Sequence, residues 1–184
     1  ILKDDELRKE FIEIYSEQGK DEARNWINNC YGPFSEEELD HRMSRYGLNP
    51  CGEILGNDFH CNLAEVHLNQ IDPENYEEQK KAFKAAALSV ACLLNHEFEV
   101  ERYRKSREYD PIVGVSFTGL FDFCVHAFGT PWLKWWEAGR PNSEEGKAFK
   151  EKEAKFLDSW RKIVKETVWE YCDKHNLRRP NRCT

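Results

Sequence analysis

Two short stretches of β-type sequence flank one long helical stretch, and this order constrains the fold more than any other feature of the chain. Residues 61–68, CNLAEVHL, partly alternate between apolar and polar side chains, as a half-buried strand does. Asp72 and Pro73 have the pattern of a helix cap and first turn, and the helix that they open extends to about residue 97. The run IVGVSF at 112–117 predicts a second strand. A strand, a helix and a strand in succession predict a parallel βαβ unit, and therefore an α/β fold class.

The first part of the chain is rich in helical patterns. Apolar side chains at helical spacing predict a helix over 4–18, and shorter helices follow over 21–30 and 36–45. Ser35 and Glu38 have the spacing of a capping box, which supports the start of the third helix. We therefore expect a helix-rich α/β chain whose two or three strands would not close a sheet alone.

Helical patterns also dominate the second half. The segment REYDP breaks the chain at 107–111, and Gly119 opens a helix with the sequence LFDFCVHAF. We expect a turn-rich aromatic segment over 129–142, after which Asn142 and Glu145 cap the last helix. The apolar stripe of that helix has a period of 3.6 residues and consists of Phe149, Phe156, Trp160, Ile163, Val164, Val168 and Tyr171.

Composition and charge exclude two classes of partner. The 184 residues carry a net charge of −7, and the pI is about 5.5. Binding to a nucleic acid polymer depends on clustered Lys and Arg side chains, so we expect no nucleic acid polymer as a partner. No apolar run approaches the roughly 18–20 residues that cross a bilayer, so we expect no membrane partner. The first residues, ILKDDELRKE, are too densely charged for a signal peptide.

The cysteines indicate a reducing, cytoplasmic location. There are seven of them at wide spacings, and an odd number in a chain of this size argues against a disulfide framework. The only methionine is Met43, and the chain stops at RRPNRCT soon after a helix. We therefore expect this sequence to be a piece of a longer polypeptide.

The segment NPCGE at 49–53 combines three reactive groups in one tight turn. Pro50 and Gly52 allow a sharp turn that places Cys51 at its tip. Glu53 can act as a general base, and Asn49 can both donate hydrogen bonds to a hydroxyl-bearing substrate and accept them from it.

The charge pattern of this turn bears on what the thiol can do. A neighbouring carboxylate raises the pKa of a thiol and so disfavours a nucleophilic thiolate at Cys51, and no His or Lys lies within the turn to offset it. Hydrogen-atom transfer by a thiyl radical remains open, and it needs a radical generator nearby.

Several structural interpretations compete with this one. Asn49 could simply form an Asx turn, and Cys61 could be a core residue at the start of a strand. Cys51, His60, Cys61 and His67 lack the short ligand spacing of a structural zinc site, so we expect no metal there. The aromatic run WLKWW at 132–136 could stack on a base or a cobalamin, but such a run more often anchors a corner between packed helices.

Three segments carry a resemblance to ribonucleotide reductases. NPCGEI followed by CNLAEVHL resembles the active-site finger loop of that family. GVSFTGLFDF is similar to the glycine-containing strand and helix of its adenosylcobalamin-dependent branch, and NLRRPNRCT to the segment that leads into the substrate-phosphate loop. The resemblance spans 47–184, and the branch that uses a separate di-iron subunit shares the Asn-x-Cys-x-Glu pattern.

The resemblance implies a role for each of four residues. Cys51 would be the thiyl radical that removes a hydrogen atom from the 3′ carbon of the ribose. Glu53 would take the proton of the 3′-hydroxyl group, and Asn49 would hydrogen-bond the hydroxyl groups of the substrate. Cys61 would be one half of the redox pair that delivers the reducing equivalents.

The same resemblance implies a fold, a cofactor and partners. Residues 1–46 would be a helical segment leading into the barrel, and 47–184 a partial segment of a ten-stranded α/β barrel with the finger loop. The cofactor would be adenosylcobalamin, and the partners would be a ribonucleotide substrate and an external dithiol reductant such as thioredoxin. The cysteine that pairs with Cys61 in the family lies on a segment absent here, so we expect the isolated chain to be inactive. The alternative is a non-catalytic helical interaction module or a decayed fragment.

Overall fold

The computed structural model describes residues 4–44, 47–49, 52, 54–180 and 182–183. The chain divides into two compact units, Ile1–Asn57 and Asp58–Thr184. The two units are defined by the contacts within each of them. The boundary after residue 46 that the sequence analysis gives comes from the family resemblance, and it stays a prediction.

The first unit contains three helices and a small hairpin. The helices are α1 (Asp5–Gln18), α2 (Lys20–Tyr31) and α3 (Glu36–Met43), close to the ranges that the sequence predicts. The side chain of Ser35 accepts a hydrogen bond from the amide of Glu38, which confirms the predicted cap of α3. The strands β1 (Gly47–Leu48) and β2 (Leu55–Gly56) then pair antiparallel.

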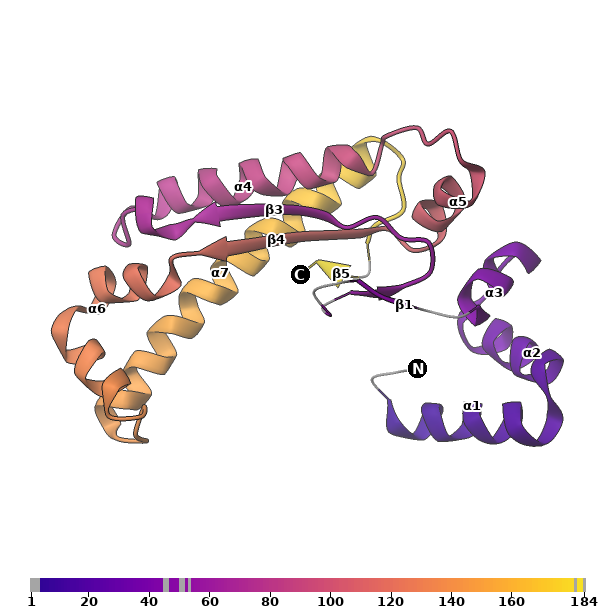
Figure 1. The fold of residues 1–184 in the computed structure, drawn as a ribbon, viewed down its shortest axis with the longest axis horizontal. Coiled ribbons are helices and arrows are strands. Elements are labelled where there is room, and N and C mark those ends of the chain that lie inside the picture. The colour runs from indigo at the N-terminus through magenta and orange to yellow at the C-terminus, as the bar shows by residue number, and fades with distance from the viewer. Residues whose placement is uncertain (1–3, 45–46, 50–51, 53, 181, 184) are drawn as a thin grey trace. The chain divides into compact units, whose positions relative to one another are not determined.

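The second unit is built on three parallel strands, β3 (Asn62–His67), β4 (Ile112–Thr118) and β5 (Arg182–Cys183), in the order β3-β4-β5 (Figure 1). Parallel pairing of β3 with β4 confirms the predicted βαβ unit. A short 3-10 helix, η1 (Leu68–Gln70), follows β3, and α4 (Tyr76–Leu93) then packs against both strands. The crossover also contains α5 (Glu101–Tyr109), which the sequence did not predict.

Two further helices complete this unit. The first is α6 (Leu120–Glu137), and the second is α7 (Glu144–Lys174), which lies against α4. The main core lies between the sheet, α4 and α7, and Trp160 of α7 stacks on Phe83 of α4 with ring centroids 4.9 Å apart. The predicted apolar stripe of α7 therefore faces this core from Phe156 to Tyr171, whereas Phe149 packs in a second cluster with Trp132 and Trp135 of α6.

One face of the parallel sheet is open along β3, whereas residues 112–115 of β4 are all buried. The side chains of Ala64 and Val66 point into the core, whereas those of Leu63, Glu65 and His67 alternate to the exposed face. Leu63 is 46% exposed. Parallel sheets in proteins normally have both faces covered by other elements, so an exposed face is unusual for a sheet of this kind.

Several boundaries differ from the sequence expectation. The prediction of a turn-rich segment over 129–142 is wrong for most of its length. The helix α6 continues to Glu137 after a kink at Gly129, whose φ is +72°. Pro131 follows that kink and fits a first helical turn. The cap of α7 is Ser143 rather than Asn142, and that of α4 is Asn75 rather than Asp72. No helix within the described residues is long and apolar enough to cross a membrane.

Candidate active-site loop and an aromatic pocket

The hairpin of the first unit is closed by Asn49. The amide N–H of Asn49 donates to the carbonyl of Ile54, and the amide N–H of Ile54 donates back to Oδ1 of Asn49, both at 3.0 Å. The carbonyl of Asn49 also accepts a 3.0 Å hydrogen bond from the amide of Gly52. Asn49 therefore holds both ends of the turn on which Cys51 and Glu53 lie in the sequence.

The conformation of Gly52 fits the sharp turn that the sequence predicts. Its φ is +79°, in the left-handed region that side chains with a Cβ atom rarely adopt. The predicted catalytic residues Cys51 and Glu53 lie outside the described residues. Asn49 is half-buried in the first unit, and Cys61 belongs to the second.

Cys61 is an exposed, reduced cysteine one residue before β3. Its position has the same parity as Leu63 and Glu65, whose side chains lie on the open face of the sheet. The neighbouring residue Asn62 donates from its side chain to the carbonyl of Ile112 at 3.1 Å, which ties the start of β3 to β4. The exposure of Cys61 argues against a role in the core and leaves the thiol accessible for redox chemistry.

A cluster of rings anchors the segment before Cys61. The imidazole of His60 lies 4.0 Å from the ring centroid of Phe98 and 5.3 Å from that of Tyr103, which comes from α5. The guanidinium of Arg107 lies 5.1 Å from the centroid of Phe98. Nδ1 of His60 and Nη1 of Arg107 are buried, and neither has a hydrogen-bond partner among the described residues.

The environment of His60 favours its neutral form. Burial, and then the charges of Arg107 and His96, lower the pKa of His60 below its ordinary value of 6.5. Among the residues that the structure describes, no three His, Cys, Asp or Glu side chains gather as metal ligands would. The zinc alternative included Cys51, which is not described.

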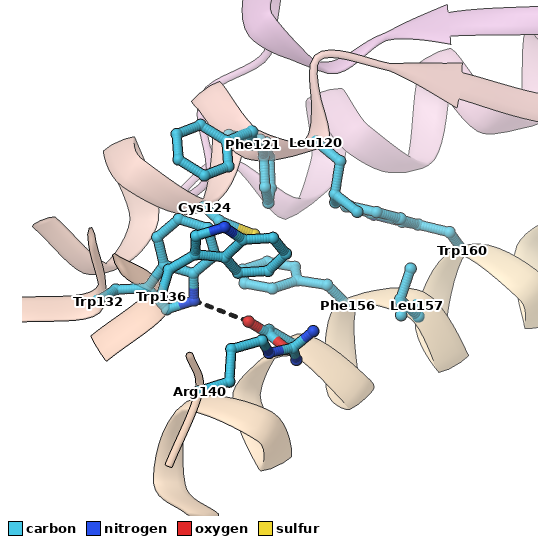
Figure 2. Close-up of a pocket in the computed structure, with 11 residues that line it drawn as sticks. Leu120, Phe121, Cys124, Trp132, Trp136, Arg140, Phe156, Leu157 and Trp160 are labelled. Atoms are coloured by element: carbon cyan, nitrogen blue, oxygen red, sulfur yellow. Dashed lines mark hydrogen bonds and ion pairs between the residues drawn. The ribbon is translucent and has the colours of Figure 1, made fainter. Parts of the chain in front are cut away.

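An aromatic pocket with a volume of about 400 Å³ lies between α6 and α7 (Figure 2). Its walls include Phe121, Trp132 and Trp136 of α6 and Phe156 and Trp160 of α7. Its polar groups form one connected set, in which Glu153 accepts hydrogen bonds from Nε1 of Trp132 at 2.7 Å and from Nη2 of Arg140 at 2.9 Å.

Two of the three tryptophans in the run WLKWW are packing residues. Trp132 and Trp135 are buried, and Nε1 of Trp135 donates to the carbonyl of Pro141 at 2.9 Å. Only Trp136, at 40% exposure, presents much of its ring surface. This agrees with the interpretation of the run as a helix-packing corner.

The pocket does not fit adenosylcobalamin as a whole. A corrin ring with its nucleotide tail is far larger than the 400 Å³ that the walls enclose. No described residue is therefore assigned to hold that cofactor.

Sequence reasoning did not identify the pocket or the ring cluster around His60. The pocket depends on the packing of α6 against α7, and Arg140 and Glu153 meet only because of that packing. For the ring cluster the sequence offered no local signal, because Phe98 and Tyr103 lie 38 and 43 residues after His60.

Comparison with known proteins finds one similarity that bears on function. The chain is 33% identical over 106 residues to an adenosylcobalamin-dependent ribonucleoside-triphosphate reductase of Lactobacillus gasseri. The matched region covers 57% of this chain and only 14% of that reductase. No protein-family model matches the chain. No solved structure matches it either.

Proposed function

We propose that this chain is the finger-loop region of a ribonucleotide reductase catalytic subunit, which converts ribonucleotides to deoxyribonucleotides. The observation that carries the proposal is the similarity to the Lactobacillus gasseri reductase. That enzyme is a ribonucleotide reductase by name, and NPCGEI and CNLAEVHL resemble the finger loop of the same family. The name of that relative supports a ribonucleoside triphosphate as substrate and adenosylcobalamin as the source of the radical.

The described geometry is compatible with the roles proposed for the loop. The hydrogen bonds between Asn49 and Ile54 close a turn, as a loop that holds a reactive sulfur in place requires. In this proposal Cys51, as a thiyl radical, removes the hydrogen atom from the 3′ carbon of the ribose. Glu53 takes the proton of the 3′-hydroxyl group, and the 2′-hydroxyl group leaves as water.

The accessible thiol of Cys61 supports the reducing half of the reaction. Cys61 and a second cysteine would together give up two electrons and two protons to the substrate and become a disulfide. An external dithiol such as thioredoxin would then reduce that disulfide. A thiol in this role must be accessible to its reaction partners, and Cys61 is exposed beside the open face of the sheet.

We also propose that the parallel strands β3, β4 and β5 are part of the ten-stranded α/β barrel of this family. Three observations support this: the parallel pairing, the helical crossover between β3 and β4, and the open face with the exposed Leu63. In the barrel that face would line the interior, where the active site of the family lies.

The test of the function is turnover by the full-length protein with a ribonucleoside triphosphate, adenosylcobalamin and a dithiol. Cys51→Ser is expected to abolish deoxyribonucleotide formation because a hydroxyl group does not form the required radical under these conditions. Cys30→Ser is the matched control, since Cys30 is an exposed, reduced cysteine of the same unit, and it should retain normal turnover. Normal turnover by Cys51→Ser would refute the assignment of the radical site to Cys51, whereas no turnover by the unsubstituted full-length protein would favour a non-catalytic helical module.

A further inference from the structure

We propose that the aromatic pocket between α6 and α7 binds a small planar aromatic anion. The ring system of the ligand would enter between the two helices, and its acidic group would meet the guanidinium of Arg140. The proposal rests on the pocket alone and does not depend on the reductase function.

The size and walls of the pocket suit a planar guest. A volume of about 400 Å³ lies within the roughly 300–1,000 Å³ that is typical of small-molecule sites. Phe121 makes edge-on contacts with Trp132 and Trp136, at centroid distances of 5.2 and 5.6 Å. Because aromatic rings favour edge-on and offset-stacked contacts, a further ring can join this arrangement with favourable geometry.

The mouth of the pocket is unusually apolar for a protein surface. Leu120, Phe121, Trp136 and Leu157 line the pocket and are each between 37% and 44% exposed. Exposed large apolar side chains that gather at one opening mark a binding site more often than an ordinary surface. These residues come from both α6 and α7, so they surround the opening from two sides (Figure 2).

The polar groups of the pocket offer donors. Each carboxylate oxygen of Glu153 already accepts a hydrogen bond, one from Trp132 and one from Arg140. A guanidinium has five N–H donors, and the bond to Glu153 uses one nitrogen of Arg140. The ion pair with Glu153 and the contact with Trp136, whose centroid lies 4.8 Å away, position the guanidinium, and the side chain of Arg140 is still 40% exposed to a ligand. A ligand that meets Arg140 must therefore supply acceptor atoms, as a carboxylate or sulfonate does.

Cys124 does not add a charge to this site. Burial, followed by the charge of Glu153, raises the pKa of the Cys124 thiol to about 11, so the thiol is protonated at neutral pH. It forms part of the apolar wall of the pocket.

Two fluorescent probes that differ in one group test the proposal on the 184-residue chain. The anionic probe is 8-anilino-1-naphthalenesulfonate, and N-phenyl-1-naphthylamine is its uncharged counterpart without the sulfonate. We expect saturable binding of the anionic probe with one site per chain, accompanied by energy transfer from tryptophan. The uncharged probe should bind more weakly.

Substitutions then locate the site. Arg140→Gln should weaken binding of the anionic probe by about tenfold or more, because it removes a charge-assisted hydrogen bond, and should leave the uncharged probe almost unaffected. Leu157→Trp should block both probes by filling the opening. Leu88→Trp is the matched control, since Leu88 is 38% exposed on α4 and does not line the pocket. Leu120→Trp, on the α6 side of the opening, serves as a second blocking variant if Leu157→Trp does not fold.

Other results would overturn the proposal. Equal binding by Leu157→Trp and Leu88→Trp would place the probes elsewhere on the chain. Equal affinity for the two probes, with no effect of Arg140→Gln, would mean a purely apolar cavity that suits a leucine or phenylalanine of another protein. Circular dichroism and the midpoint of urea denaturation establish that each variant is folded before its binding is compared.

Discussion

The indole N–H of Trp160 donates a hydrogen bond to Oε1 of Gln79 at 3.1 Å, in the interior between α7 and α4. Both side chains are almost completely buried. The amide nitrogen of Gln79 in turn donates to the carbonyls of Asp72 and Pro73, at 3.2 and 3.0 Å. One buried amide thus joins α7, α4 and the turn before α4, and its polar atoms are satisfied within the core.

The first prediction concerns this contact. Trp160→Phe keeps an aromatic ring but removes the donor, so Oε1 of Gln79 is left buried without it. We expect the free energy of unfolding to fall by about 1–3 kcal/mol, measured by urea denaturation. Trp136→Phe is the control, because that ring is 40% exposed, and it should change stability by about 0.5 kcal/mol or less. Equal effects of the two substitutions would contradict the argument.

The cap of α3 and the pairing of β3 with β4 are parts of the fold that the sequence predicts well, whereas the caps of α4 and α7 were misplaced. The cap of α3 depends on Ser35 and Glu38, three residues apart, and the structure contains that bond. The parallel pairing of β3 with β4 follows from a strand, a helix and a strand in succession. The cap depends on residues that are close together in the sequence, and the strand pairing follows from the order of the elements along the chain. A sequence pattern shows both.

The helix α5 shows why other parts were missed. Its sequence, ERYRKSREY, has no apolar stripe, and only Ser106 is buried. The helix is supported by ion pairs one turn apart, such as Arg104 with Glu108 at 3.0 Å, and by the contact of Tyr103 with His60. Periodicity of apolar residues does not report such contacts.

The candidate site also contains features that the sequence pattern did not predict. Oδ1 of Asn49 accepts from the amide of Ile54, five residues on, whereas an Asx turn would involve residue 51, so the Asx-turn alternative stays a prediction outside the described residues. The aromatic pocket was beyond prediction, because Arg140 and Glu153 meet only after α6 packs on α7.

The second prediction separates two roles of Asn49. Asn49→Asp keeps an oxygen that can accept from the amide of Ile54 but removes the side-chain N–H donors, whereas Asn49→Ala removes both. Hydrogen exchange at the Ile54 amide should therefore speed up in Asn49→Ala and change little in Asn49→Asp.

If Asn49 also binds the hydroxyl groups of a ribonucleotide, both variants of the full-length protein should lose most of their turnover. Normal turnover by Asn49→Asp would limit Asn49 to closing the hairpin.

The third prediction concerns the thiol of Cys61. Cys61→Ser in the full-length protein should stop dithiol-supported turnover, because the serine can neither give up an electron nor form a disulfide. Cys92→Ser is the control, since Cys92 is also an exposed, reduced cysteine of the second unit. Deoxyribonucleotide formation over many cycles is the measurement, and undiminished turnover by Cys61→Ser would exclude a redox role.

The last prediction uses His60 as a probe of pH-dependent stability. Burial and the charges of Arg107 and His96 lower the pKa of His60 in the folded chain, so the unfolded chain binds a proton more readily. Stability should therefore decrease as the pH falls through the ordinary value of 6.5, and the loss should level off below the folded-state pKa. His60→Phe keeps a ring against Phe98 and Tyr103 but does not titrate, so it should reduce the difference in unfolding free energy between pH 7.5 and pH 5.5 as measured with urea. His126→Phe, at an exposed position on α6, should leave that difference unchanged, and an equal reduction by both variants would mean that the cluster around His60 is not its source.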